Sequence, residues 1–221
     1  MTMYRHQFVD GSVFPHAPGK VVCVGRNYAD HAKELGNEIP SSPLLFIKPA
    51  TAMVAMSEPL NLPQGRGACH HELEMALLIG RPLSNTGPSE CRTAIAGIGL
   101  ALDLTLRELQ DELKKKGHPW ERAKAFDGAC PLAEFMIFDQ GLDFSSLTLR
   151  LSRNGDVQQQ GSCGDMLFSV ENLLSEISQS FSLMPGDVVL TGTPAGVGPL
   201  QSGDQLVAEL GDFLRVETVV L

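Results

Sequence analysis

Residues 70–79, with the sequence HHELEMALLI, decide the fold because they place two acids one residue apart in an otherwise apolar run. In a β-strand, alternate side chains share a face, so Glu72 and Glu74 would point the same way and the apolar residues between them the other way. In an α-helix the two acids would lie about 200° apart and diverge. The strand therefore brings two carboxylates together at the mouth of an apolar sheet.

Two carboxylates this close need a cation between them or a shared proton. The alternative, from this stretch alone, is a pair of solvated acids on an edge strand. A third acid, Asp103, ends the apolar run of residues 94–104, where it must be paired, protonated or metal-bound. Oxygen-only ligands select a hard cation, so Glu72, Glu74 and Asp103 predict one Mg²⁺ or Mn²⁺ per chain. The adjacent His70 and His71 would point to opposite strand faces and do not indicate zinc.

A short helix is predicted after the β-branched strand of residues 20–25, with Asn27 as its cap and Gly36 as its end. His31 and Glu34 lie three residues apart and would share a face of this helix. A carboxylate beside an imidazole fixes its tautomer and raises its basicity, which suits a general base. The alternative is a surface pair worth a few tenths of a kcal/mol.

Residues 105–108 (TLRE) form a capping-box pattern that predicts a helix running to about residue 116, with Gly117 as its stop. Arg107 and Gln110 would share one face of this helix, beside Asp103. An arginine and an amide there could anchor a substrate carboxylate. The alternative is a solvated face that continues into the lysines at 114–116.

Two further segments carry polar groups of interest. Lys124 lies in a loop-like segment, and its local sequence alone favours a surface lysine. The glycine-rich residues 192–199 lack the Lys-Ser/Thr of a phosphate-binding P-loop and do not open a helix, which argues against nucleotide binding. Backbone amides in this loop, and the hydroxyl of Thr193, could still hold a carboxylate.

Composition limits the class of protein. The chain has 221 residues, a net charge of −9 and a pI near 5.1, which makes nucleic acid an unfavourable partner. Its five cysteines are scattered without a CxxC pair, as in reduced proteins of a cytosol-like compartment. No apolar run approaches the roughly 18 residues that span a bilayer, so we expect a cytoplasmic protein with no membrane partner.

The remaining pattern predicts many short strands and two or three helices. Strands are expected at residues 44–49 and 188–191 and in a hairpin over 147–161, and a helix at 169–181. No linker or internal repeat is visible. The fold class predicted is mainly β with a few helices, in one catalytic domain of 1–221, with residues 1–18 as a lead-in and 19–221 as the core.

Five motifs, taken together, resemble the fumarylacetoacetate hydrolase family, and more narrowly its short acylpyruvate hydrolase-like branch. The similarity runs from about residue 18 to the end. The motifs are residues 26–31 (RNYADH), 70–74 (HHELE), 103–107 (DLTLR), 124–127 (KAFD) and 191–198 (TGTPAGVG). Each is weak alone, but five in this order and spacing are specific. The resemblance implies a mixed β-sandwich roll, usually a homodimer, that uses a divalent metal.

The resemblance also implies roles for single residues. Glu72, Glu74 and Asp103 would be the metal ligands. His31 and Glu34 would activate water from a lid helix, and Lys124 would steady an enolate or oxyanion. The implied substrate-binding residues are Arg26, Tyr28, Arg107, Gln110 and Thr193. Residues 129–133 read ACPLA where the family usually has SCPLG, which affects a turn rather than the chemistry.

The reaction that these features predict is the metal-dependent cleavage of the C–C bond of acylpyruvates, releasing pyruvate and a carboxylic acid. The substrate would be a small anionic keto acid. The alternatives are oxaloacetate decarboxylation and isomerisation or decarboxylation of hydroxymuconate-type diacids, all through the same metal enolate. A non-catalytic binder of keto acids is a further alternative, against which the lysine and the His–Glu pair argue.

Overall fold

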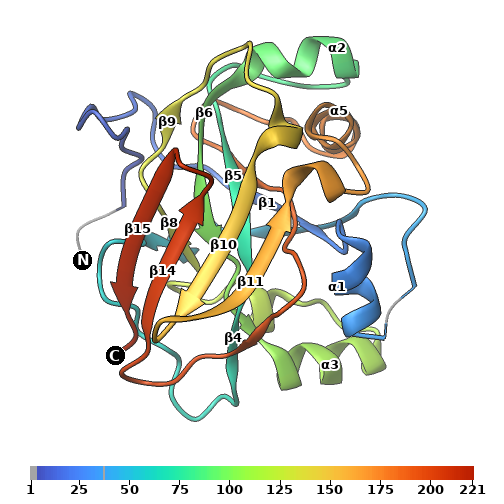
Figure 1. Cartoon of the computed structure of the whole chain (residues 1–221). Helices are drawn as coiled ribbons and strands as arrows, with labels where there is room; N and C mark the ends of the chain where they lie inside the picture. Colours follow the sequence, from blue (N-terminus) through green and yellow to red (C-terminus); the bar gives the residue numbers. More distant parts are fainter. Residues whose placement is uncertain (1–3, 37) are drawn as a thin grey trace.

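The computed structural model describes residues 4–36 and 38–221 (Figure 1). In these residues a mixed sheet with strand order β2–β1–β12–β5–β6–β8–β3, to which β9 adds by pairing with β6, forms the centre of the molecule. Its parallel pairs are β1 with β12 and β3 with β8. The strands are β1 (Val21–Gly25), β2 (Leu44–Lys48), β3 (Met53–Ala55), β5 (Leu73–Ile79), β6 (Ile95–Leu102), β8 (Cys130–Leu132), β9 (Met136–Ile137) and β12 (Val188–Leu190).

A second sheet crosses in front of β5 in Figure 1 and has the order β11–β10–β14–β15. The central sheet and this sheet make the predicted mixed β-sandwich roll. A small third sheet, β13–β4–β7, lies at the end of β5 that carries the acids. These strands are β4 (Cys69–His71), β7 (Thr105–Leu106), β10 (Thr148–Arg153), β11 (Asp156–Ser162), β13 (Gly198–Pro199), β14 (Gln205–Leu210) and β15 (Leu214–Val219).

The helices lie at two ends of the roll. Figure 1 shows α2 and α5 at the top and α1 and α3 at the lower right. Among the described residues, none of the helices is both long and apolar enough to cross a membrane. The helices are α1 (Ala29–Glu34), α2 (Pro88–Cys91), α3 (Arg107–Lys116), α4 (Glu121–Lys124) and α5 (Val170–Ser180), with 3₁₀ turns at Ala50–Ala52, Arg92–Ala94, Phe144–Ser146 and Cys163–Asp165.

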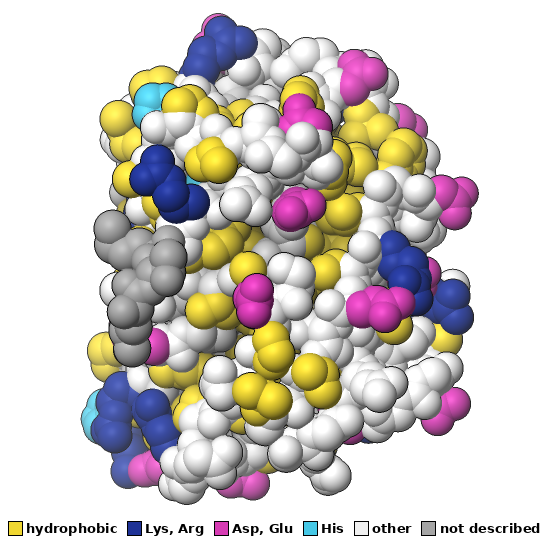
Figure 2. All heavy atoms as spheres, turned by 90° about the vertical axis from the view of Figure 1, so that its left-hand side faces the viewer, with side chains coloured by type: hydrophobic (Ala, Val, Ile, Leu, Met, Phe, Trp, Pro, Cys, Tyr) yellow, Lys and Arg dark blue, Asp and Glu magenta, His cyan; other side chains and the backbone are white. Residues whose placement is uncertain are grey.

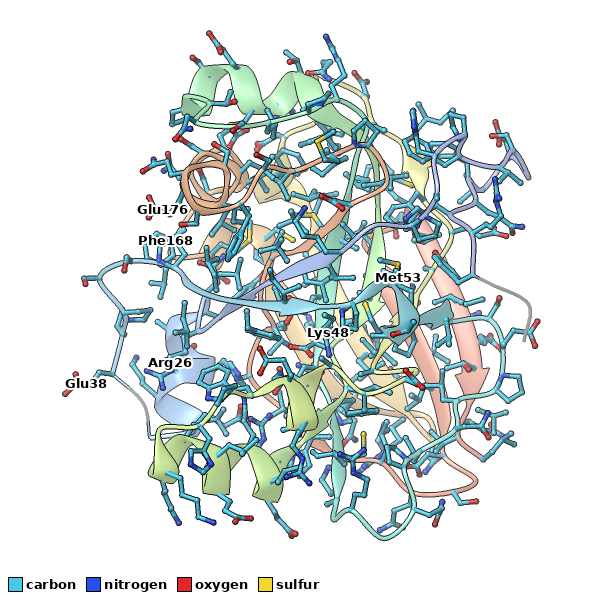
Figure 3. The ribbon with its side chains drawn as sticks, turned by 180° about the vertical axis from the view of Figure 1, so that it is seen from behind. Arg26, Glu38, Lys48, Met53, Phe168 and Glu176 are labelled. Atoms are coloured by element: carbon cyan, nitrogen blue, oxygen red, sulfur yellow. The ribbon has the colours of Figure 1, made fainter. Side chains whose placement is uncertain are left out.

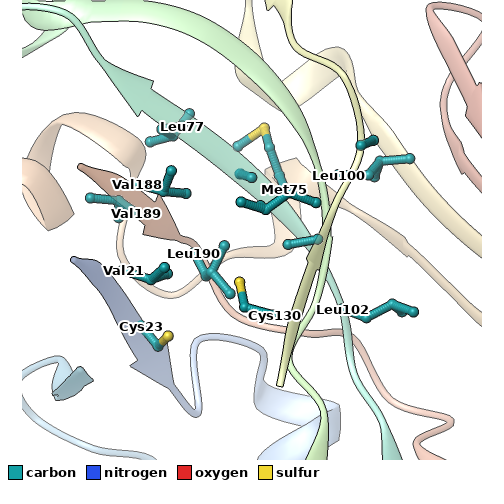
Figure 4. Close-up of a cluster of buried hydrophobic side chains, with 14 of the residues drawn as sticks. Val21, Cys23, Met75, Leu77, Leu100, Leu102, Cys130, Val188, Val189 and Leu190 are labelled. Atoms are coloured by element: carbon teal, nitrogen blue, oxygen red, sulfur yellow. The ribbon is translucent and has the colours of Figure 1, made fainter. Parts of the chain in front are cut away.

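The core is built on β5, every residue of which is buried. Aliphatic side chains from the neighbouring strands β1, β6 and β12 surround it, including Leu100 and Leu190 (Figure 4). Burial of this much apolar surface, at roughly 25 cal/mol per Å², is the main force that holds the sheet in place. Unlike the core, the surface carries charged side chains: on the face shown in Figure 2, acidic and basic side chains are interspersed with hydrophobic ones.

Two predicted helix caps are wrong. Asn27 does not cap α1, whose N-cap is Tyr28, because the Asn27 side chain donates to the carbonyls of Phe168 and Thr191 instead. Thr105 lies in β7, and α3 begins at Arg107 without a side-chain cap. In both cases a tertiary partner takes the side chain that the local pattern assigns to the helix.

Other boundaries agree with the sequence. Gly117 ends α3 in the left-handed conformation, with φ 65°, and the Ser169 hydroxyl caps α5. β5 begins at Leu73, so Glu72 lies in the break between β4 and β5 rather than inside a strand. Residues 1–3 of the predicted lead-in, and residue 37, lie outside the described residues.

Candidate metal and substrate site

Three carboxylates meet where β5 begins and β6 ends. One oxygen from each of Glu72, Glu74 and Asp103 lies within 4.8 Å of the others, and all three residues are buried. The strand register explains the meeting, because Leu73 pairs with Leu102 and the Asp103 amide donates to the Glu72 carbonyl at 2.8 Å. Glu72, directly before β5, and Glu74, within it, therefore lie beside the acid that follows β6.

Lys124 lies among these acids and not on the surface, contrary to the prediction from its local sequence. Its Nζ donates to Asp103 Oδ2 at 2.6 Å, to Glu72 Oε2 at 2.9 Å and to the Thr105 hydroxyl at 2.6 Å. Burial lowers the pKa of Lys124, but the charges of Asp103 and Glu72 outweigh burial and raise that pKa above its ordinary value. The lysine is therefore a fixed positive charge among the carboxylates.

Lys48 is a second buried lysine that the sequence reasoning missed. Its side chain has no exposed surface, and Nζ lies 2.7 Å from Asp103 Oδ1 (Figure 3). The same Nζ donates to the carbonyls of Ala129, at 3.0 Å, and Lys124. The available signal was a lone lysine at the end of an apolar strand, directly before Pro49.

Glu74 is held by the glycine-rich loop. Its Oε2 accepts from the Gly192 amide at 2.6 Å. Gly192 has φ +99°, and a Cβ there would lie 2.7 Å from Asn27 Cβ, so both the conformation and the space require glycine. Burial raises the pKa of Glu74 well above its usual range, and the charges of Asp103 and Glu72 add to the effect.

The donor set fits a hard divalent cation. It consists of clustered carboxylates with no thiol or imidazole among them, which is the preference of Mg²⁺ and Mn²⁺. Lys48, Lys124 and Arg107 contact Asp103 and Glu72, whereas Glu74, whose pKa is raised first by burial and then by the two neighbouring acids, is the carboxylate that a bound cation would stabilise most.

The His31–Glu34 pair forms on α1 as predicted. His31 is 5% exposed and lines the cleft that opens onto Glu72 and Glu74. Its Nδ1 lies 3.3 Å from Glu34 Oε2. Glu34 also accepts from the Gly196 amide, at 3.0 Å and 3.2 Å, so the carboxylate ties α1 to the glycine-rich loop.

Arg107 and Gln110 share a face of α3, as expected. Arg107 Nη1 donates to Gln110 Oε1 at 2.8 Å, and Nη2 contacts Glu72 Oε1. Both residues line the cleft with Arg26 and Thr193. The fifth residue implied for substrate binding, Tyr28, is buried and does not line this cleft.

Gln159 in β11 is a further residue that the sequence reasoning missed. It is fully buried, and its amide joins three segments. Oε1 accepts from His71 Nδ1 at 2.9 Å and from the Leu73 amide at 3.0 Å. Nε2 donates to the Thr193 hydroxyl at 2.7 Å and to the Pro194 carbonyl at 2.8 Å. In the sequence it is the middle one of three consecutive glutamines, and nothing in the sequence sets it apart from the other two.

The fold and the acid cluster define a known class. The family model for the fumarylacetoacetate (FAA) hydrolase C-terminal domain matches residues 20–221. The chain is a member of this family of enzymes.

Three relatives show the range of activities around it. The chain is 50% identical over 205 residues to oxaloacetate tautomerase YcgM of Escherichia coli, covering 92% of this chain and 94% of that protein. It is 30% identical to fumarylpyruvate hydrolase from Pseudomonas aeruginosa, solved in complex with Mn²⁺ and pyruvate, with a TM-score of 0.93 over 100% of this chain and 97% of the other. It is 36% identical to 5-carboxymethyl-2-hydroxymuconate delta-isomerase from Mycobacterium smegmatis, with a TM-score of 0.81 over 94% and 80%.

Proposed function

We propose that this protein catalyses the metal-dependent keto–enol tautomerisation of oxaloacetate, a short 2-keto dicarboxylate. The observation that carries the proposal is the charge pattern of the cleft. Carboxylates line its inner end together with Lys124 and Arg107, which contact them, and two further cations, Arg26 and Lys114, also line the cleft. A bound divalent cation at the inner end would leave the cleft suited to a dianion. The 50% identity to an oxaloacetate tautomerase supports the same substrate.

The proposed metal ligands are Glu72, Glu74 and Asp103. The metal supplies Lewis-acid polarisation of the 2-keto group. Arg107 and Gln110 bind the adjacent carboxylate, as a guanidinium and an amide do for planar anions. Arg26 and Lys114 also line the cleft, and they are the proposed partners of the second carboxylate. A neutral acyl group would leave Arg26 without an anionic group of the ligand, and Lys114 with only Asp111, 3.6 Å away.

His31 is the proposed base. It takes a proton from C3, so that the C3–H bond breaks and the electron pair moves toward the 2-keto oxygen. Glu34 holds the imidazole and stabilises its charged form. Lys124 stabilises the negative charge that develops on the oxygen. Proton transfer to that oxygen gives the enol, and the reverse sequence returns the keto form.

The second candidate function is the hydrolysis of acylpyruvates. The His31–Glu34 pair favours it, because the same base can take a proton from water that attacks the distal carbonyl of a 2,4-diketo acid. The C3–C4 bond then breaks and leaves pyruvate enolate and a carboxylic acid. The likeness to a fumarylpyruvate hydrolase supports this candidate, whereas the two cations at 26 and 114 support the dicarboxylate.

A substrate panel separates the candidates. The purified protein, with Mg²⁺ or Mn²⁺, is given oxaloacetate and a set of acylpyruvates. Enol loss is followed by ultraviolet absorbance, and pyruvate release by a coupled dehydrogenase. We expect tautomerisation to be the faster reaction and to fall on the order of 10²-fold or more in His31→Ala. The exposed His118→Ala is the matched control. Cleavage of an acylpyruvate at a higher kcat/KM would replace the proposal by the second candidate.

We also propose that the chain is a single catalytic domain that forms a homodimer in the cytoplasm. Light scattering on the purified protein gives the assembly, and limited proteolysis gives the domain count. A monomer at micromolar concentration, or a stable internal fragment, would contradict the corresponding part.

A further inference from the structure

Gln159 has a single possible amide orientation. The Leu73 amide can only donate and the Pro194 carbonyl can only accept, so Oε1 faces Leu73 and Nε2 faces Pro194. A flipped amide would place two donors together on one side and two acceptors together on the other. Because Oε1 also accepts from His71, the proton of that imidazole is on Nδ1.

The fixed amide determines what the Thr193 hydroxyl can do. Nε2 donates to Thr193 Oγ1 at 2.7 Å, so one lone pair of the hydroxyl oxygen is taken. The hydroxyl proton must therefore point away from Gln159. The nearby Pro194 carbonyl can accept this proton, but it lies 3.4 Å from Oγ1 and already accepts a hydrogen bond from Gln159 Nε2 at 2.8 Å. Thr193 also lines the cleft, where a bound anion would present a charged acceptor.

We infer that Gln159 is a positioning residue that makes Thr193 a hydrogen-bond donor to the carboxylate of the bound keto acid. This inference rests on the proposed function only in that a keto acid occupies the cleft. Gln159 is in the second sheet and does not line the cleft, so it acts through Thr193. The Gln159 amide, whose oxygen and nitrogen each have two buried partners, holds one orientation of the Thr193 hydroxyl, and this orientation selects an acceptor as the ligand.

The test is the isosteric variant Gln159→Glu. The introduced carboxylate can still accept from Leu73 and His71, but it cannot donate to Thr193. The Thr193 hydroxyl then donates to that carboxylate and no longer to the ligand. In the presence of Mn²⁺, calorimetry with pyruvate is expected to show about tenfold weaker binding. Mn²⁺ binding measured alone is expected to stay within about twofold, and KM to rise more than kcat falls.

A double-variant comparison separates positioning from a merely structural role. Thr193→Val removes the donor, so adding Gln159→Glu to it is expected to weaken pyruvate binding no further. Losses that multiply in the double variant, or unchanged pyruvate affinity in Gln159→Glu, would overturn the inference. If Gln159→Glu does not fold, Thr193→Ser and Thr193→Val decide: the hydroxyl variant must bind pyruvate about tenfold more tightly, and equal affinities overturn it.

The outcomes also distinguish this inference from the proposed function. Pyruvate binding that depends on Gln159 in a protein that does not tautomerise oxaloacetate would overturn the function alone. If the protein tautomerises oxaloacetate but its pyruvate affinity is the same in the parent and in Gln159→Glu, the inference alone would be overturned.

Discussion

Lys48 and Asp103 form an ion pair with almost no contact with solvent, since their side chains are 0% and 2% exposed and Nζ lies 2.7 Å from Oδ1. Asp103 is shared, because Lys124 holds its other oxygen at 2.6 Å. One carboxylate of the candidate metal site is thus fixed from two sides by lysines of different segments. Asp103 is oriented before any ligand binds.

Replacing Lys48 by methionine is expected to lower the free energy of unfolding by about 3–5 kcal/mol, because it leaves a buried carboxylate short of one partner. Urea unfolding of the metal-free protein measures the loss. Lys116→Met is the matched control: its partner Glu112 is also exposed, at 57%, and surface pairs contribute about 0–1 kcal/mol. Equal losses of unfolding free energy in the two variants would show that the buried pair stabilises the fold no more than the surface pair does.

Glu74→Gln is expected to weaken Mn²⁺ binding on the order of tenfold or more while leaving the fold intact. The amide oxygen can still accept from Gly192, and the change removes a carboxylate whose pKa burial and two neighbouring acids raise. Calorimetry gives the affinity and thermal unfolding gives the stability. Glu217→Gln, on the exposed strand β15, removes an acid elsewhere and is expected to change neither. Unchanged Mn²⁺ affinity in Glu74→Gln would remove it from the ligand set.

Glu34→Gln is expected to reduce kcat about 10²- to 10³-fold, because the neutral amide no longer stabilises the charged imidazole of His31. The amide oxygen can still accept from Gly196, so docking of α1 is retained. The control is Asp30→Asn on the same helix, which changes only an exposed pair with Lys33. A kcat equal to the parent's would show that His31 needs no carboxylate partner.

The buried His6, away from the candidate metal site, is expected to make the free energy of unfolding depend on pH. Burial lowers its pKa below the ordinary 6.5, against the opposing effects of the Gly186 carbonyl and Asp187. Between the lowered pKa and 6.5 the unfolded chain binds a proton that the folded chain does not, so stability falls as pH falls through this window. Relative to His6→Gln, the parent's free energy of unfolding is expected to decrease between about pH 7.5 and pH 5.5. If the free energies of unfolding of the parent and of His6→Gln changed with pH in parallel, the lowered pKa of His6 would be contradicted.

Much of the site could be predicted from residues whose surroundings are local. Glu72, directly before β5, and Glu74, within it, lie close together as the alternation of side chains along an extended chain predicts, and Arg107 and Gln110 meet because helix geometry requires it. The acid at the end of the next apolar run then joins them through pairing of β5 with β6.

Residues that depend on distant partners could not be assigned in this way. Lys124 looks like a surface lysine in its own segment, and only the acids 21 and 52 residues away make it a buried one. Asn27 and Thr105 look like helix caps, but chain segments brought near by the fold take their side chains. Gln159 is indistinguishable from its neighbours until Thr193 and Leu73 are placed beside it.

The parallel pairing of β1 with β12 determines the order in which parts of this protein can fold during synthesis. Val21 pairs with Val188, and α1 after β1 docks by Glu34 onto Gly196 after β12. During synthesis the amino-terminal strand must therefore wait for a partner about 167 residues later in the chain, and closing so long a loop is slow. A ribosome-bound chain that has exposed the acids but not yet Gly192 carries them without their partner loop. The candidate site is thus completed only after residues 192–196 have emerged.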